Sequence, residues 1–418
     1  MNFVKSSYLS AISTAVSLIT KVVVNKITAL YIGPNGFAIY GQFKDFVSLI
    51  SSIGQLGTEN GIIKYTADTK NDINKYKRFL ATAFKLHIAS ALLISLFILI
   101  FRSWINQILF ADNSFAPEII IVGCSTLFIS LHNLFLGILN GLKLLKEYIT
   151  VSIISTLAIA VTASISVKYY GLSGLIFSIG FNHLLLFIIS LFFISSYCNI
   201  SISIFKEKFQ KHIFRGLIDF SAMSLSGIIS LSVALLFIRT LIINNLGDNY
   251  AGSWDALWRI SAIYILFLTS SFKFYLIPTF STLEDSLLKQ EILKIWRITL
   301  PSILVIISGI YIFKDFIIQF LFTEEFLLIK SIILYQLLGD IFRIHSWTLG
   351  NLLMAKKKTK IFITLQVVWA ILFCSLGTIL SRIYGFKGIT LAYLITCVFH
   401  FAFLNISLKN ELWIVKKY

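Results

Sequence analysis

Long apolar stretches follow one another along almost the whole chain and are separated by short polar or charged segments. A helix of about 20 apolar residues is long enough to cross a hydrocarbon core of roughly 30 Å. We therefore expect an all-α integral membrane protein, with no outer loop long enough to host an active site. The pattern predicts about twelve transmembrane helices, at 8–31, 37–63, 79–101, 118–140, 149–167, 173–197, 217–245, 250–279, 298–316, 329–354, 361–381 and 388–408.

The composition agrees with lipid as the solvent of this chain. Its 418 residues are 57% hydrophobic and only 13% charged, whereas a soluble domain contains roughly 25% charged residues. The first apolar run continues to Tyr31 without a small-residue cleavage site, so it is interpreted as a retained helix rather than a signal peptide. The cysteines show no metal-like pairing, which argues against a disulfide framework or a zinc site.

The net charge of +17 would suggest nucleic acid as a partner of a soluble protein. In membrane proteins, however, basic residues collect in the cytoplasmic loops. With the N-terminus inside, the predicted cytoplasmic segments hold 22 of the 36 Lys and Arg residues and the opposite loops hold five. This asymmetry fits an even number of helices with both termini in the cytoplasm, and no nucleic acid is expected.

Two glycine motifs recur at a constant separation. Gly33 recurs as Gly247, and Gly171 recurs as Gly385, with 214 residues between the members of each pair. The recurrence predicts two six-helix lobes, 1–205 and 206–418, joined by the basic segment 198–216. Because six is even, the lobes would be parallel repeats around an axis normal to the membrane. Such a pair suits a cavity that opens alternately to each side, although duplication without transport is the other interpretation.

Nine Lys and Arg residues fall inside the predicted spans, where a lipid-exposed charge costs at least about 2.5–3.5 kcal/mol. Five of them lie near a span end, where the side chain can also snorkel to the interface, namely Lys26, Lys85, Arg239, Lys273 and Lys330. Four lie deeper and should face protein or water, namely Lys21, Lys44, Arg259 and Arg343.

Acidic residues are too few to neutralise these cations. Asp255 lies four residues before Arg259, and Asp340 three residues before Arg343, so each pair shares a helix face. Static ion pairs that fix helix packing are one explanation, but the surplus of cations indicates an anionic occupant. Cations bind phosphate, and the neighbouring aromatic and amide side chains suit sugars or, alternatively, anchor the helices at the membrane interface.

Several stretches, in this order and spacing, resemble a known family: Ile32–Gly36, Asn60–Tyr65, Ser270–Thr279, Tyr335–Asp340 and Met354–Lys356. The chain is similar to the multidrug/oligosaccharidyl-lipid/polysaccharide (MOP) exporter superfamily, and within it to the O-antigen and enterobacterial common antigen flippases of the Wzx type. The resemblance extends over essentially the whole chain. It implies a MATE-like fold of two lobes in the bacterial cytoplasmic (inner) membrane.

The resemblance also implies a substrate, an undecaprenyl-diphosphate-linked oligosaccharide that moves from the cytoplasmic to the periplasmic leaflet by alternating access through a cationic cavity. The first, second, seventh and eighth helices line that cavity in the family. They carry Lys21, Lys26, Lys44, Arg239, Arg259 and Lys273, to which we add Arg343 on the tenth helix as a substrate-binding candidate. Asp45, Asp255 and Asp340 are candidates for ion coupling or gating.

No cofactor or metal is expected, and a proton or sodium gradient is the candidate energy source. Besides the substrate, the candidate partners are membrane lipids and the glycan polymerase with its chain-length machinery.

Other function classes fit less well. A MOP-type exporter of drugs usually handles organic cations, for which acids rather than cations should dominate the cavity. A membrane enzyme acting on polyprenyl-linked glycans needs a larger extramembrane loop or carboxylates at a loop edge. No P-loop, nucleotide fingerprint or metal cluster is present in the sequence. The sequence therefore predicts a transporter rather than an enzyme.

Overall fold

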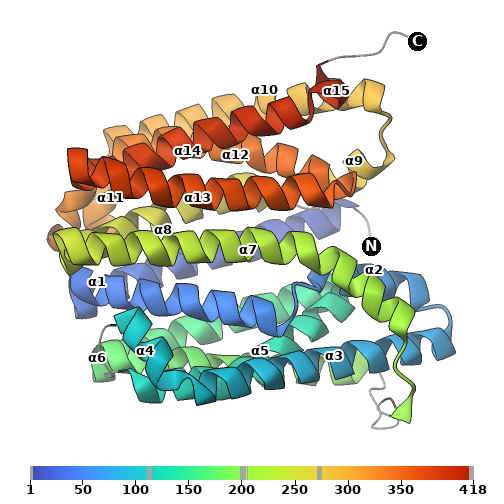
Figure 1. Ribbon diagram of the computed structural model, residues 1–418. Coiled ribbons are helices and arrows are strands. Elements are labelled where there is room, and N and C mark those ends of the chain that lie inside the picture. The colour runs from blue at the N-terminus through green and yellow to red at the C-terminus, as the bar shows by residue number, and fades with distance from the viewer. Residues whose placement is uncertain (1–2, 111–114, 198–203, 205, 271–274, 414–418) are drawn as a thin grey trace. The chain divides into compact units, whose positions relative to one another are not determined.

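The computed structural model describes residues 3–110, 115–197, 204, 206–270 and 275–413, and within these ranges every regular element is a helix (Figure 1). The chain forms two compact units. Unit 1 comprises Met1–Ile32 and Gln42–Ile228, and unit 2 comprises Gly33–Gly41 and Ile229–Tyr418. Both a short stretch of the first helix and the second part of the seventh therefore belong to unit 2. The predicted lobe boundary at residues 205 and 206 stays a prediction.

The helices that begin in unit 1 are α1 (Phe3–Gly54), α2 (Glu59–Thr69), α3 (Ile73–Ile100), α4 (Arg102–Phe110), α5 (Ala116–Gly141), α6 (Leu145–Tyr197) and α7 (Lys211–Leu246). In this unit α5 packs against both α3 and α6. The core between them is filled by large apolar side chains, among them Phe79, Phe84 and Phe135.

The helices of unit 2 are α8 (Asp248–Ser270), α9 (Leu276–Thr282), α10 (Asp285–Ile312), α11 (Lys314–Leu321), the 3-10 helix η2 (Glu324–Ser331), α12 (Ile333–Ala355), α13 (Thr359–Tyr384), α14 (Phe386–Ser407) and α15 (Lys409–Leu412). Here α14 packs against both α12 and α13, and α10 packs against α12.

Eight helical stretches of the described residues are long and apolar enough to cross a membrane. Two of them, α1 with α2 and α6, exceed 50 residues and are interrupted at Gly33 and Gly171, where the backbone is not helical. Helices α8 and α12 are not among the eight, because charged and polar side chains interrupt their apolar sequence. The all-α membrane fold is confirmed, and the count of twelve spans stays a prediction.

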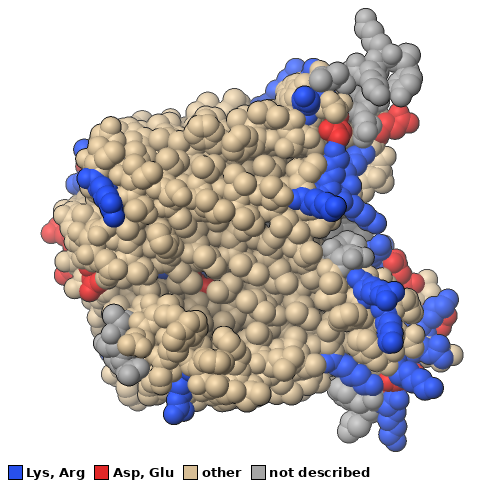
Figure 2. All heavy atoms as spheres, viewed as in Figure 1, with Lys and Arg blue, Asp and Glu red and all other residues tan. Residues whose placement is uncertain are grey.

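Charged side chains are distributed as a membrane requires. On the face shown in Figure 2, Lys, Arg, Asp and Glu gather near the ends of the helices, and the surface along the helices between them is almost free of charge. Many large apolar side chains of the helices are exposed at the surface of the molecule, for example Leu93, Phe192 and Val305. An apolar surface of this extent is stable only when lipid covers it.

The glycines that recur along the sequence have the same backbone role in both halves. Gly33 and Gly247 have φ angles of 57° and 100°, and Gly171 and Gly385 have φ angles of 59° and 58°. Only glycine adopts this left-handed region without steric cost. Each of the four therefore ends one helical segment and allows the next to begin in a new direction.

A third repeated feature was not recognised in the sequence. Lys143 and Lys357, again 214 residues apart, both have positive φ, at 63° and 53°. The turns around them make the same hydrogen bonds, since Leu144 N–H donates to Leu139 and Lys358 N–H donates to Leu353, both over 2.9–3.0 Å. The backbone is thus duplicated in its turns as well as in its glycines.

Some predicted boundaries were wrong. The predicted span 37–63 is not one helix, because the chain leaves the helix after Gly54 and enters α2 only at Glu59. Leu56 and Gly57 both have positive φ there. Lys330, predicted inside a span that begins at 329, lies in η2 before α12 begins, and its Nζ is 2.8 Å from Asp315.

The N-terminus of α3 shows why that helix begins where it does. Asp72 has extended backbone angles, and its carboxylate accepts hydrogen bonds from the N–H groups of Asn74 and Lys75 over 3.1 Å. Such a cap satisfies N–H groups that have no partner within the helix. The N–H group of Lys75 is also the main reason why the pKa of Asp72 lies below its ordinary value.

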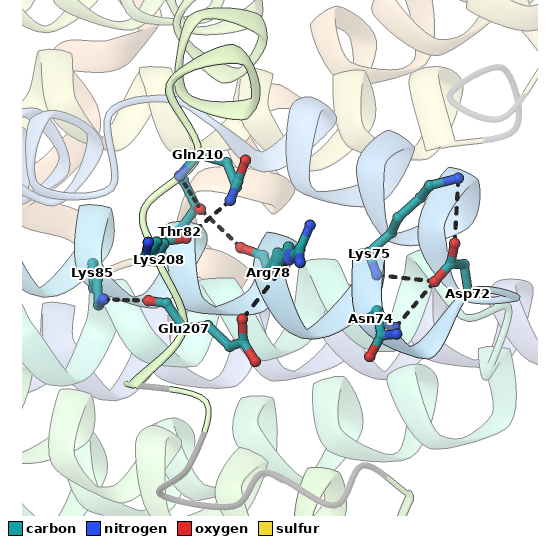
Figure 3. A network of polar contacts seen from close by, with 9 residues as sticks. All are labelled: Asp72, Asn74, Lys75, Arg78, Thr82, Lys85, Glu207, Lys208 and Gln210. Atoms are coloured by element: carbon teal, nitrogen blue, oxygen red, sulfur yellow. Dashed lines mark hydrogen bonds and ion pairs between the residues drawn. The ribbon is translucent and has the colours of Figure 1, made fainter.

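The basic segment between the two halves is fastened to α3 (Figure 3). Lys85 donates to the backbone carbonyl of Glu207 over 2.7 Å, and the N–H of Gln210 donates to the hydroxyl of Thr82 over 3.1 Å. Arg78 lies 3.9 Å from the carboxylate of Glu207. The segment just before α7 is therefore an attached part of unit 1 and not a free tether.

Candidate functional site

Helix α8 carries the centre of one buried charged cluster in unit 2, the carboxylate of Asp255. Its Oδ1 is 2.8 Å from Nη2 of Arg239 on α7, and its Oδ2 is 2.8 Å from Nε of Arg259 one turn further along α8. Both arginine side chains are buried, with 2% and 10% of their surface exposed. One carboxylate thus holds two guanidinium groups, and the cluster keeps a net positive charge.

Aromatic rings cover these guanidinium groups. The Arg259 guanidinium carbon lies 4.2 Å from the ring centre of Phe37 and 4.9 Å from that of Tyr40, and Arg239 lies 5.6 Å from Trp254. Such faces attract cations more strongly once water is excluded. Gly41 lies directly against the pair, because a Cβ atom at this position would overlap Oδ1 of Asp255.

A second cluster surrounds Asp340 on α12, which is fully buried. Oδ2 accepts hydrogen bonds from Ser261 over 2.6 Å and from Tyr264, both on α8. Oδ1 accepts a hydrogen bond of 2.6 Å from the hydroxyl of Tyr393 on α14. Three hydroxyl groups from two neighbouring helices therefore donate to this carboxylate, which has about four acceptor sites, and they join α8, α12 and α14.

Arg343 lies next to that cluster but is less enclosed. Its Nη1 is 3.9 Å from Oδ1 of Asp340, and 31% of its side chain is exposed. The guanidinium carbon lies 4.9 Å from the ring centre of Trp258. Trp258 also contacts Trp254 and Tyr393 edge-on, so aromatic rings connect the two charged clusters within unit 2.

The structure tests the predicted pairs directly. The Asp255–Arg259 and Asp340–Arg343 pairs that the helical spacing predicted are both present. Snorkelling was wrong as an explanation for Arg239, because this side chain is buried in an ion pair. Ser261 and Tyr393 were missed as partners of Asp340. In the sequence, the spacing of Ser261 and Tyr264 on one face of α8 was the only signal that could have indicated a polar partner for Asp340. No sequence signal linked Tyr393 to Asp340.

The remaining candidates lie in unit 1 or outside the described residues. Lys21 and Lys44 on α1 are exposed, and Lys26 and Asp45 on the same helix are half-buried. All four belong to unit 1. Lys273 lies outside the described residues. The substrate-binding and coupling roles of these residues stay predictions.

The buried polar contacts of unit 1 are of another kind. The ring of His87 lies between two hydroxyl groups, with Nε2 3.0 Å from Thr58 and Nδ1 3.0 Å from Ser130. His132 is 3.0 Å from the carbonyl of Leu186, and His183 is 2.9 Å from the hydroxyl of Ser125. Imidazole, hydroxyl and backbone groups make these contacts, whereas arginines and carboxylates make those of unit 2.

Nothing in the described residues resembles a metal centre, since no three His, Cys, Asp or Glu side chains come together there. Cys124, Cys374 and Cys397 are free thiols, and Cys198 lies outside the described residues.

The helical fold, with ion pairs between its least apolar helices, is similar to that of several solved membrane proteins. The chain has a TM-score of 0.73 with an inward-facing multidrug-resistance MATE transporter of the MOP superfamily, at 13% identity over 96% of this chain and 98% of that one. The TM-score with the Lipid II flippase MurJ in an inward closed conformation is 0.72, at 17% identity over 97% and 87% of the two chains. At such identities the likeness shows the fold, which is of the predicted MOP type.

Sequence comparison gives the family. The model described as polysaccharide biosynthesis protein matches residues 3–284, so the chain belongs to this family. The chain is also 24% identical over 403 residues to the Lipid III flippases of Escherichia coli strain K12 and Shigella flexneri, covering 96% of this chain and 97% of each relative. These relatives are flippases and transporters rather than enzymes. The chain is a multi-pass protein of the inner membrane, and the predicted resemblance is confirmed.

Proposed function

We propose that this chain is a flippase that translocates an undecaprenyl-diphosphate-linked oligosaccharide from the cytoplasmic to the periplasmic leaflet. Two of its relatives are named Lipid III flippases and one structural neighbour is a Lipid II flippase, which supports a lipid-linked oligosaccharide as the substrate. A diphosphate with attached sugars does not cross about 30 Å of hydrocarbon unaided, whereas its polyprenyl chain is soluble in lipid. The protein has to supply only a polar route for the head group.

The observation that carries the proposal is the excess of positive charge in the interior of unit 2. In the ion pairs of the described residues, three arginines, Arg239, Arg259 and Arg343, face two carboxylates, Asp255 and Asp340. Buried charges are retained where they pair or serve a function. A guanidinium suits phosphate, which it binds through two parallel hydrogen bonds, and Trp258, which is only partly buried, supplies a ring face for a sugar.

The remaining parts of the proposal concern direction, topology and energy. We place both termini in the cytoplasm because most loop cations fall on that side of the predicted map. The substrate contacts in unit 1 would be Lys21, Lys26 and Lys44. A proton or sodium gradient would drive the cycle through Asp45, Asp255 or Asp340, and the glycan polymerase with its chain-length machinery would receive the product.

Complementation separates a flippase from a drug exporter. A strain that lacks its lipid-linked oligosaccharide flippase should regain surface glycan when it expresses this chain. Lys44→Ala should lower that glycan at equal protein level, because Lys44 lies on the exposed side of α1 and outside the ion pairs that hold unit 2 together. Normal glycan with Lys44→Ala would remove this residue from the substrate route.

Proteoliposomes test the energy source. Flipping of a labelled lipid-linked oligosaccharide should accelerate when a proton or sodium gradient is imposed. Equal rates with and without both gradients contradict coupling through the three aspartates but leave the flippase function intact. Resistance to organic cations without any restored glycan would instead favour the drug exporter.

A further inference from the structure

The three arginines inside unit 2 differ in their distance from the nearest carboxylate oxygen and in how much of each side chain is exposed. Arg239 and Arg259 each lie 2.8 Å from a carboxylate oxygen and are buried to 2% and 10% exposure. Arg343 lies 3.9 Å from its nearest carboxylate oxygen and keeps 31% of its side chain exposed. A separation of 3.9 Å is longer than a hydrogen bond, so Arg343 is the least tightly paired and the most accessible guanidinium of the three.

The surroundings of Asp340 explain why Arg343 is not drawn closer. An ionised carboxylate accepts several hydrogen bonds, and here Ser261, Tyr264 and Tyr393 already supply three. The hydroxyl of Tyr393 binds Oδ1, which is also the oxygen nearest to Arg343. Tyr264 and Ser261 bind the other oxygen. Tyr393 and Arg343 therefore share one carboxylate oxygen, and the hydroxyl competes with the guanidinium for it.

The position of Arg343 along its helix indicates what it meets. It lies near the middle of α12, which runs from Ile333 to Ala355. An exposed guanidinium at that depth is stable only where water or a polar ligand reaches it. The ring of Trp258 lies beside the guanidinium. A guanidinium that stacks on a ring can still present its N–H groups edge-on to a pair of oxyanions.

We propose that Arg343 is the cation of unit 2 that contacts the anionic head of the substrate, and that Tyr393 is a positioning residue that keeps it available. Arg239 and Arg259 instead hold α7 and α8 together through Asp255. The inference rests on the proposed function and adds which cation binds. The ligand is a pair of oxyanions, either the diphosphate of the lipid carrier or the carboxylate of an acidic sugar.

Binding to the purified full chain in nanodiscs tests the role of Arg343. Farnesyl diphosphate carries the diphosphate without sugar, and glucuronate carries a sugar carboxylate without phosphate. Arg343→Gln should weaken the binding of one of these probes by about 10-fold or more, because it removes charge-assisted hydrogen bonds. Arg343→Lys should recover part of that loss, since it restores the charge but not the planar fork. The probe that responds identifies the source of the oxyanion.

A matched pair of tyrosine variants tests the positioning role. Tyr393→Phe frees the oxygen nearest to Arg343, so the two should form a direct ion pair and probe binding should fall about 3-fold or more. Tyr264→Phe removes the same group from the other oxygen, which keeps Ser261, and should have a smaller effect. Asp340→Asn combined with Tyr393→Phe should restore binding, because the amide no longer captures the guanidinium. A purely structural loss would not be rescued in this way.

The outcomes separate this inference from the proposed function. Wild-type affinity in Arg343→Gln overturns the role of Arg343, and a double variant as weak as Tyr393→Phe overturns that of Tyr393. Arg259→Gln should lower the unfolding temperature. If Arg259→Gln unfolds at the same temperature as the wild type and no longer binds the probe, while Arg343→Gln still binds it, the two roles are reversed. Arg259 is then the cation that contacts the substrate. If the wild type restores no glycan and binds neither probe, the proposed function itself fails, together with the inference.

Discussion

Residues 41 and 255 occupy equivalent positions in the two halves of the chain, 214 residues apart, yet one is glycine and the other aspartate. The same separation relates Asn25 to Arg239 and Thr126 to Asp340. Asp255, Arg239 and Asp340 thus have uncharged equivalents in the N-terminal half, whereas the equivalent of Arg259 is Asp45, so the pairs themselves are not repeated. The turns and glycines, in contrast, keep the same backbone conformation in both halves.

The difference teaches which features a duplicated scaffold must keep. A glycine with positive φ is required wherever the chain turns between two helices, so its replacement is penalised in either half. An interior polar group needs only some partner to satisfy it. Histidine with hydroxyl groups meets that need around His87, and arginine with carboxylate meets it around Asp255. We infer that the interior polar side chains of the two halves diverged, while the glycines and turns that set the course of the backbone were kept.

The largest effect should follow the loss of the Asp255 charge. Asp255→Asn leaves two buried guanidinium groups without their counter-charge, which should destabilise the protein by about 3–5 kcal/mol. His87→Leu removes two hydrogen bonds between uncharged groups and should cost less, about 1–3 kcal/mol. Unfolding in detergent micelles measures both variants under the same conditions. An Asp255→Asn loss no larger than that of His87→Leu would contradict the contrast between the two interiors.

Gly41 offers a second test, since its Cβ position is already occupied by the Asp255 carboxylate. Gly41→Ala should force the Asp255 and Arg239 side chains apart and cost about 1–3 kcal/mol. Gly309→Ala in α10 is the matched control, because no atom lies within 4 Å of its Cβ position. This control should be neutral or stabilising by up to about 1 kcal/mol, as helix propensity predicts. Equal melting temperatures for the two variants would show that the close contact between Gly41 and Asp255 does not contribute to stability.

Local sequence predicted the features that depend on local physics. Apolar length predicted the membrane fold, and helical spacing predicted the Asp255–Arg259 pair because residues four apart share a face. The partner of Arg239 could not be predicted, since it depends on how α7 packs beside α8. The contact between Tyr393 and Asp340 joins residues 53 positions apart on two different helices, and no periodicity encodes it. The break after Gly54 was missed although Gly54, Gln55 and Gly57 interrupt the apolar pattern there, because the predicted span was drawn across them.

The shared backbone predicts equal costs at equivalent glycines. Gly171 and Gly385 have nearly the same φ, and neither has an atom within 4 Å of its Cβ position. Both glycines also have ψ near −140°, so Gly171→Ala and Gly385→Ala should each cost about 1–3 kcal/mol from backbone strain alone. The two losses, measured by the same unfolding assay, should agree within about 0.5 kcal/mol, and the double variant should show their sum. Clearly unequal losses would mean that the two turns are not equivalent.

The smallest effect should come from an ion pair outside the membrane-spanning helices. Lys330 donates to Asp315 over 2.8 Å, and this hydrogen bond lowers the pKa of the Asp315 carboxyl below its ordinary value. A lowered pKa contributes stability that is present above the unfolded value of about 3.9 and is lost as the pH falls through the folded value.

Asp315 is 64% exposed, so solvent screens the ion pair with Lys330 and the contribution to stability is small. Asp315→Asn should therefore melt slightly earlier than the wild type at pH 7, and the difference should shrink as the pH falls below about 3.9 and in about 1 M salt. A difference that persists under both conditions would mean that Asp315 stabilises unit 2 through contacts other than its charge.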